Sequence, residues 1–262
     1  YQTDKYWIAE GSKGLRSIQR KGSNSFEALN EPIILDGPYS NSAFDIVCKN
    51  DKVYMIIGGK DLLNGKRFDK GGYILTYDYD KWSFIDPKEA QKKLNLPRNP
   101  RDYTSIAVTT DDSNDEIVYA SSMGDGVIQY KNGTPVQSYN EKNAFKETAG
   151  GYGSGYCYID GLAFDKNGNL WMTSSEVNHA GLVLDKAGAW HRLDIEQLRG
   201  VYTINDILIT STNDKWIYVP RNTPKLVMIP NSESLDEVSS YEFTTLIAVS
   251  YTHLTLPTNS RV

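Results

Sequence analysis

The sequence predicts an all-β fold, a β-propeller of four-stranded antiparallel blades, with about five blades present in 262 residues. Three observations support this fold class. A similar unit recurs along the chain at intervals of 47, 64, 53 and 45 residues. Each unit reads as short apolar strands separated by turns. The composition includes 18 Tyr and 5 Trp against 7 Phe, and such residues favour half-buried pleated surfaces.

The clearest unit is YIDGLAFDKNGNLWMTSS, from Tyr158 to Ser175. It reads as two strands joined by a turn, and Asn167-Gly168 is a strong hairpin signal because both residues tolerate positive φ. A loop of small residues follows, and then two further strands at Gly181–Leu184 and Ala189–Leu193. Four short strands with three turns make one predicted blade.

Alignment of the second strand of each unit places five apolar residues in equivalent positions: Trp7, Tyr54, Val118, Trp171 and Trp216. A small antiparallel sheet cannot cover both of its faces alone, so stacked blades must bury them. We therefore expect Tyr54, Val118, Trp171 and Trp216 to pack between blades.

The repeat has irregular parts as well. The loop Gly58–Gly72 is longer than its equivalents, and the connection that follows contains a predicted helix at Lys88–Leu96. A second short helix is predicted at Asp194–Arg199. The first unit is incomplete, and Tyr241–Val249 is the last expected strand, which could begin a sixth unit.

The predicted domain organisation is one incomplete propeller over residues 1–249, as a piece of a larger propeller, followed by a non-native tail at residues 250–262. The tail, SYTHLTLPTNSRV, continues no upstream pattern and resembles the translation of sequencing-adaptor DNA. Deletion of these residues is expected to leave the thermal midpoint unchanged.

Composition limits the function. The formal net charge is -5, from 28 basic and 33 acidic residues, which argues against non-specific nucleic-acid binding. Two cysteines, Cys48 and Cys157, cannot form a disulfide scaffold, and both are expected to be buried free thiols. No apolar run approaches the ~20 residues of a spanning helix.

Catalytic patterns are missing from the sequence. The three histidines are not spaced as metal ligands, and there is no G-x-S-x-G elbow. The glycine run Gly150–Gly155 lacks the ending of a phosphate-binding loop, and the acidic run Asp111–Glu116 sits where a hairpin turn is expected. We therefore predict no catalytic residue, no metal and no cofactor.

Binding residues are instead expected on one face of the propeller. That face collects the loop after each second strand and the connections between blades, and these carry basic and aromatic residues suited to an anionic or sugar ligand. The alternative for each lysine or arginine is a solubilising surface role. The candidate ligand-binding residues are Lys60, Arg67, Arg101, Tyr152, Tyr156, His179 and Arg221.

The repeats also resemble known proteins. GLAFDKNGNLWMTSS with the following Gly-Leu-Val-Leu strand resembles the repeat of regulator propellers, found in periplasmic sensor regions of hybrid two-component systems. LDGPYSNSAFDIVCKNDKVYMIIGG, TSIAVTTDDSNDEIVYASSMGDGVIQYKNG, YNEKNAF and LVLDKAGAWHRL follow, in this order, the pattern of the PorZ-like propeller family of the type IX secretion system. This resemblance covers Asp36 to Arg221.

The resemblance implies a non-enzymatic protein at the outer membrane surface or in the periplasm of a Gram-negative bacterium. Its implied partners are the sortase and other proteins of the attachment complex, and an anionic lipopolysaccharide or other glycan. Two alternatives stay open: a ligand-sensing propeller of a hybrid two-component receptor, and a glycan-active propeller enzyme. The enzyme would need carboxylates that line the channel.

Overall fold

The computed structural model describes residues 5–10, 14–33, 37–145, 155–221, 224–232, 234–235 and 244–247. The tail at 250–262 and the candidate residue Tyr152 lie outside this range. Regular structure in the described residues is almost entirely antiparallel β, as the sequence predicts.

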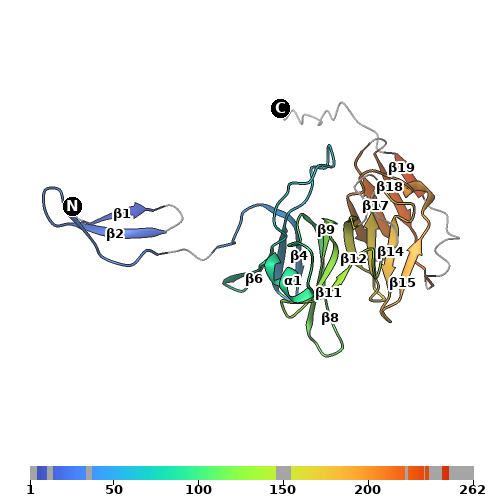
Figure 1. The fold of residues 1–262 in the computed structure, drawn as a ribbon, viewed down its shortest axis with the longest axis horizontal. Helices are drawn as coiled ribbons and strands as arrows, with labels where there is room; N and C mark the ends of the chain where they lie inside the picture. The colour runs from blue at the N-terminus through green and yellow to red at the C-terminus, as the bar shows by residue number, and fades with distance from the viewer. Residues whose placement is uncertain are drawn as a thin grey trace, which may run out of the picture.

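Each sheet is built from strands that are consecutive in sequence, and the sheets from β4 onward stand side by side in a row (Figure 1). The second and third four-stranded sheets are also joined to each other, through the pairs Cys157↔Gly124 and Tyr158↔Met123. The sheets are β1 (Lys5–Ala9), β2 (Leu15–Arg20) and β3 (Phe26–Ala28); β4 (Ala43–Lys49), β5 (Lys52–Ile57), β6 (Ile74–Asp78) and β7 (Lys81–Ile85); β8 (Tyr103–Thr110), β9 (Glu116–Gly124), β10 (Gly126–Lys131) and β11 (Thr134–Tyr139); β12 (Cys157–Phe164), β13 (Leu170–Ser174), β14 (Gly181–Leu184) and β15 (Trp190–Leu193); β16 (Asp206–Ile209), β17 (Lys215–Val219), β18 (Lys225–Ile229) and β19 (Thr244–Ile247).

The first and last sheets qualify the predicted repeat. The β1–β3 sheet has three strands, as expected of an incomplete unit, and its first hairpin stands apart from the row (Figure 1). Trp7 in this sheet is 54% exposed. At the other end, β19 pairs with β18 and is the fourth strand of the last sheet. The interpretation of this segment as the start of a sixth unit is therefore wrong.

The faces between neighbouring sheets form most of the core, in three large clusters of buried apolar side chains. Tyr54 and Val118 share the cluster between the β4–β7 and β8–β11 sheets, and both are almost fully buried, as predicted. Trp171 lies in the cluster between the β12–β15 and β16–β19 sheets and is also buried, as predicted. Trp216 is only half-buried, contrary to prediction.

The alignment at Val118 is wrong by one residue. Tyr54, Trp171 and Trp216 pair with the third residue of the inner-strand motifs Asp45-Ile-Val47, Gly161-Leu-Ala163 and Asp206-Ile-Leu208. The corresponding residue of Ser105-Ile-Ala107 pairs with Tyr119. A shift of one residue in a strand moves a side chain to the other face. Val118 is therefore buried against the preceding sheet, whereas Tyr119 packs towards the following one.

The inner strands are joined from one sheet to the next by the first residue of these motifs. The Asp45 carboxylate accepts hydrogen bonds from Ser105 Oγ and from Ile106 N, both at 3.1 Å. Ser105 Oγ in turn accepts from Leu162 N at 3.2 Å. In the β12–β15 sheet the equivalent residue is Gly161, where an added Cβ would lie 2.6 Å from Ile207 N of the next sheet. The first residue of the motif thus sets the close approach of neighbouring inner strands, through polar side chains at Asp45 and Ser105 and through the missing side chain at Gly161.

The helical predictions are close to the observed elements. Helix α1 spans Pro87–Leu94, where Lys88–Leu96 was expected. Its N-cap is Asp86, whose carboxylate accepts from Lys88 N at 2.9 Å, and proline at the first position suits a helix start. Asn95 in the left-handed conformation ends it. The second predicted helix is a 3₁₀ turn, Glu196–Leu198.

The two cysteines differ. Cys157 is buried, and burial is the main cause that raises the pKa of its thiol to about 12. Cys48 is exposed, so the prediction of two buried thiols is wrong for this residue. The cause is the position of β4 in the first sheet of the row: Ile46, two residues before Cys48, is likewise 59% exposed.

Candidate anion-binding site

Two faces of the row of sheets carry different connections. We call loop face the side with the loops that follow each second strand and with the connections between sheets. We call turn face the opposite side, which carries the short hairpin turns. Strand direction alternates within each sheet, so these two sets of connections must emerge on opposite sides.

The long loop after β5 crosses the loop face. Lys60 of this loop is 2% exposed, and its Nζ forms an ion pair with Asp160 of β12 and donates to Ile204 O at 2.7 Å. The loop starts at two glycines with positive φ, and a Cβ on Gly59 would lie 2.0 Å from the Phe44 ring. Lys60 therefore ties three sheets together, and its prediction as a ligand-binding residue is wrong, because the ammonium group is buried and paired.

The same loop brings one arginine onto an aromatic ring. The Arg67 and Arg98 guanidinium carbons lie 5.9 and 4.8 Å from the centroid of the Tyr156 ring. Arg98 Nη1 also donates to Tyr156 Oη at 3.3 Å. A Cβ on Gly124 would come within 3.6 Å of Tyr156, Arg67 and Arg98 atoms. These residues come from different sheets and connections, yet they converge on one point of the loop face.

Two carboxylates hold these arginines in place. Arg98 Nε donates to Asp125 Oδ1 at 2.7 Å, and Arg101 N lies 3.1 Å from Asp125 Oδ2. The guanidinium of Arg101 donates to the Asp69 carbonyl at 2.8 Å, and Arg67 lies 3.6 Å from the Asp69 carboxylate. Burial alone would lower the pKa of Arg98, but the Asp125 charge and hydrogen bond outweigh it and raise this pKa. The arginine is thus fixed as a cation.

A cavity of about 320 Å³ opens beside these arginines. Its lining includes three cations, one carboxylate and two neutral polar side chains: Lys88, Arg98, Arg101, Asp86, Asn99 and Tyr73. Asn99 Oδ1 is buried and has no hydrogen-bond partner among the described residues. We call these residues, with Arg67 and Tyr156, the arginine site. Its volume is at the lower end of the range for small-molecule pockets.

The arginine site presents guanidinium groups beside an aromatic ring. Guanidinium groups recognise carboxylate and phosphate oxygens by paired hydrogen bonds, and a tyrosine ring presents a flat surface to a sugar or a cation. Within the described ranges, no three His, Cys, Asp or Glu side chains are arranged to hold a metal ion. The guanidinium groups of the arginine site are suited to recognition of an anionic group.

The other predicted residues lie elsewhere. Arg221 stacks on Tyr202, with its guanidinium carbon 5.4 Å from the ring centroid, next to Gly65 of the long loop. His179 is half-buried in the β13–β14 loop, near Asp194, whose pKa is lowered mainly by a hydrogen bond from Arg199. Three predicted residues meet in the arginine site: Arg67, Arg101 and Tyr156.

Sequence reasoning missed the central arginine of the site, Arg98, and Lys88 at its edge. Arg98 lies in the predicted basic connection to β8, but nothing local distinguishes it from a solvated arginine. The available signal was Asp125, the single residue between β9 and β10. Its significance depends on contacts between sheets, which a single sequence does not show.

Comparison with known proteins identifies the fold. No protein-family model matches the sequence, and no curated protein matches it. PorZ of Porphyromonas gingivalis is similar over 94% of this chain, with a TM-score of 0.69 and 20% identity. The fold is that of a β-propeller. This chain spans about a third of PorZ, or 32%.

Two further propeller structures are more distant. YCF48 of Cyanidioschyzon merolae has a TM-score of 0.45 and 16% identity, with 92% of this chain and 67% of YCF48 covered. The extracellular domain of BT4673 of B. thetaiotaomicron has a TM-score of 0.44 and 15% identity, with 86% and 26% covered. Among the residues that the structure describes, no helix is long and apolar enough to cross a membrane.

Proposed function

We propose that this chain is part of a non-enzymatic, PorZ-like surface propeller that binds an anionic lipopolysaccharide or another acidic glycan through the arginine site. The observation that carries the proposal is the convergence of Arg67 and Arg98 on Tyr156 beside a basic cavity. This grouping stands out because the chain as a whole is acidic, with a net charge of -5. A segregated positive face steers and holds anionic ligands.

The likeness to PorZ supports the location and the partners in this proposal. PorZ is an essential bacterial surface component of the type IX secretion system. By analogy, we place this chain at the outer membrane surface or in the periplasm of a Gram-negative bacterium. Its partners are then the sortase and other secretion-complex proteins, and co-purification with the sortase from such a bacterium tests that part.

Glycan binding is tested with purified anionic lipopolysaccharide and the same material after chemical dephosphorylation. The double variant Arg67→Ser/Arg101→Ser should weaken binding of the anionic form about tenfold or more, since each charged hydrogen bond contributes ~1.5–3 kcal/mol. Binding should also weaken as salt rises, because the ligand contacts are charged and solvent-accessible. Surface plasmon resonance on immobilised lipopolysaccharide measures both effects.

The matched control is Lys92→Ser/Lys93→Ser, which removes the same charge from exposed positions at the end of α1. If both double variants lose affinity equally, general charge and not the arginine site drives binding. Equal affinity of the Arg67/Arg101 variant and the parent would refute the site. Turnover of a polysaccharide by the purified chain would refute the non-enzymatic assignment, and a kinase region further along the same gene would favour the sensor alternative.

A further inference from the structure

A second and larger cavity opens on the turn face, between the β12–β15 and β16–β19 sheets. Its volume is about 780 Å³, well within the range of ligand pockets. Hairpin turns form its walls: the β12–β13 turn, the β14–β15 turn, the β16–β17 turn and the segment that follows β18. We call it the turn-face pocket. The arginine site lies on the opposite side of the sheets.

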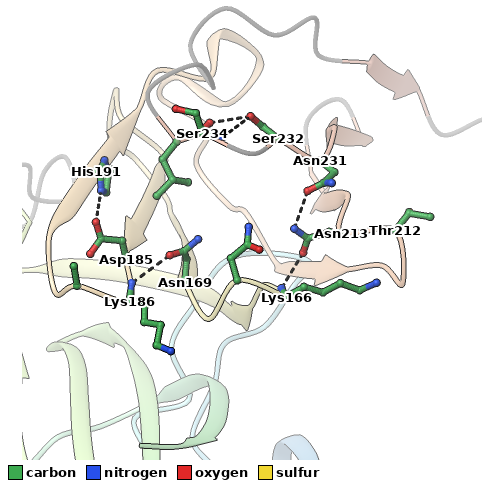
Figure 2. Close-up of a pocket in the computed structure, with 13 residues that line it drawn as sticks. Lys166, Asn169, Asp185, Lys186, His191, Thr212, Asn213, Asn231, Ser232 and Ser234 are labelled. Carbon is green, nitrogen blue, oxygen red and sulfur yellow. Dashed lines mark hydrogen bonds and ion pairs between the residues drawn. The ribbon is translucent and has the colours of Figure 1, made fainter. Parts of the chain in front are cut away.

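Amide and hydroxyl groups dominate the lining of the turn-face pocket. Asparagine is the commonest residue there, with Asn167, Asn169, Asn213 and Asn231, and the only apolar side chains are those of Ala187 and Leu235. Figure 2 shows the side chains of Lys166 and Lys186 running away from the centre of the pocket. The interior therefore offers neutral hydrogen-bonding groups.

The walls are fixed by hydrogen bonds before any ligand arrives. Asn213 accepts from Lys166 N at 2.9 Å and donates to Asn231 Oδ1 at 2.8 Å, which joins two turns (Figure 2). Asn169 accepts from Lys186 N at 3.2 Å and donates to Asp165 Oδ2 at 2.9 Å. A wall with its groups already placed loses little entropy when a ligand binds.

Unused hydrogen-bonding capacity faces the same space. Asn231 uses its Oδ1 within the wall, but no described residue accepts from its Nδ2, and none bonds to the side-chain amide of Asn167. His191 Nε2 is held 2.9 Å from Asp185 Oδ2, and this hydrogen bond is the largest cause that lowers the pKa of Asp185. An ionised carboxylate in the wall accepts from hydroxyl groups and repels anions.

From these features we propose that the turn-face pocket is a binding site for a neutral saccharide. Amides pair a donor and an acceptor on adjacent atoms, which matches the neighbouring hydroxyl groups of a sugar ring. The lining has few apolar side chains for an apolar ligand to pack against, and an anion would meet the Asp185 carboxylate without a lysine ammonium group turned inward. The site is independent of the arginine site in residues, face and ligand charge.

A glycan array printed with neutral and acidic saccharides provides the first test, with the 262-residue chain as the probe. We expect saturable binding of at least one neutral saccharide. That saccharide is then titrated into ¹⁵N-labelled protein. The Trp171 indole N–H, which donates to Asp165 Oδ2 at 2.9 Å beneath the pocket floor, should shift during the titration.

The pocket variant is Asn167→Ala/Asn231→Ala, which removes two exposed side chains. It also removes the wall hydrogen bond from Asn213 to Asn231, but it leaves the backbone hydrogen bonds of the turns in place. Loss of two hydrogen bonds should weaken saccharide binding about tenfold. The matched control, Asp112→Ala/Ser113→Ala, changes two exposed polar residues in the equivalent turn of the β8–β9 hairpin and should bind like the parent.

Two results would overturn the inference: no neutral saccharide binds, or the pocket variant binds it as tightly as the parent. The outcome is separable from that of the arginine site. Arg67→Ser/Arg101→Ser should lose acidic saccharides and keep neutral ones, whereas the pocket variant should do the reverse.

Discussion

The same residue types are buried in sheets inside the row but more exposed in the sheets at its ends. Trp171 and Trp216 occupy equivalent positions on β13 and β17, but Trp171 is 2% exposed and Trp216 is only half-buried. On the last sheet, Leu208 is 66% exposed and Tyr218 40%. A strand pattern thus specifies a two-sided sheet, and the neighbouring sheet decides whether each side becomes core.

The largest expected effect is at the inner tryptophan. Trp171→Ala should lower the free energy of unfolding by roughly 3–5 kcal/mol, as for other buried large aromatics. The change also removes the ring beneath Lys215 Nζ, which lies 4.6 Å from its centroid. Urea unfolding measures the effect, with the exposed Trp7→Ala as control at under ~0.5 kcal/mol. An unmoved midpoint for Trp171→Ala would contradict the blade packing.

The next largest effect is expected at the ion pair between Lys60 and Asp160, which joins two distant sheets. Lys60→Met should cost about 3 kcal/mol or more, because it leaves the Asp160 carboxylate buried without its cation. The double variant Lys60→Met/Asp160→Asn should recover part of that loss, since it removes both charges. Denaturant unfolding of these two variants and of the single variant Asp160→Asn completes the double-mutant cycle. Additive losses would mean that the two side chains do not interact in solution.

A smaller effect is expected at the outer tryptophan. Trp216→Ala should cost about 1 kcal/mol, because a half-buried side chain removes less apolar area from water than Trp171. The same unfolding experiment gives the value. If Trp216→Ala costs as much as Trp171→Ala, the outer face is covered in solution, and the contrast between inner and end sheets does not hold.

The sequence predicted the strands, the unit length and the helix at α1, because these depend on local pattern and turn chemistry. It predicted the burial of Tyr54 and Trp171 for the same reason. It was wrong at Val118, where two adjacent apolar residues gave no way to choose between faces, and Tyr119 takes the equivalent place. The register of the second strand is set by its pairing with the inner strand. The apolar pattern alone allows two registers that differ by one residue.

The binding residues were harder to predict. A lysine or arginine on a loop looks the same in sequence whether it is solvated, like Lys66, or buried in an ion pair, like Lys60. Arg67 and Tyr156 were predicted, but their meeting with Arg98 depends on how three connections from different sheets fold over one face. The turn-face pocket had no sequence signal, because each of its asparagines also suits an ordinary hairpin turn.

The smallest effect is expected at Asp206 in the last sheet of the row, and it is measured as a change in the pH dependence of stability. Asp206 occupies the position of Asp45, but no described residue donates to its second oxygen, and burial, followed by the charges of Asp45 and Asp160, raises its pKa to about 6. An unfolded aspartate titrates near 3.9, so the folded state holds this proton more tightly. Its contribution to stability is therefore present below pH ~4 and lost as the pH rises through 6. Asp206→Asn should leave the thermal midpoint unchanged near pH 4 and raise it at pH 7. Because the side chain is partly solvated, the gain should stay under ~1 kcal/mol.

Asp45→Asn is the contrasting variant: its carboxylate accepts from Ser105 and Ile106, so loss of that charge should destabilise the protein at pH 7. Equal and opposite shifts at the two positions would support the difference between a joined and an open sheet. Destabilisation at both would show that the Asp206 carboxylate is also paired in solution.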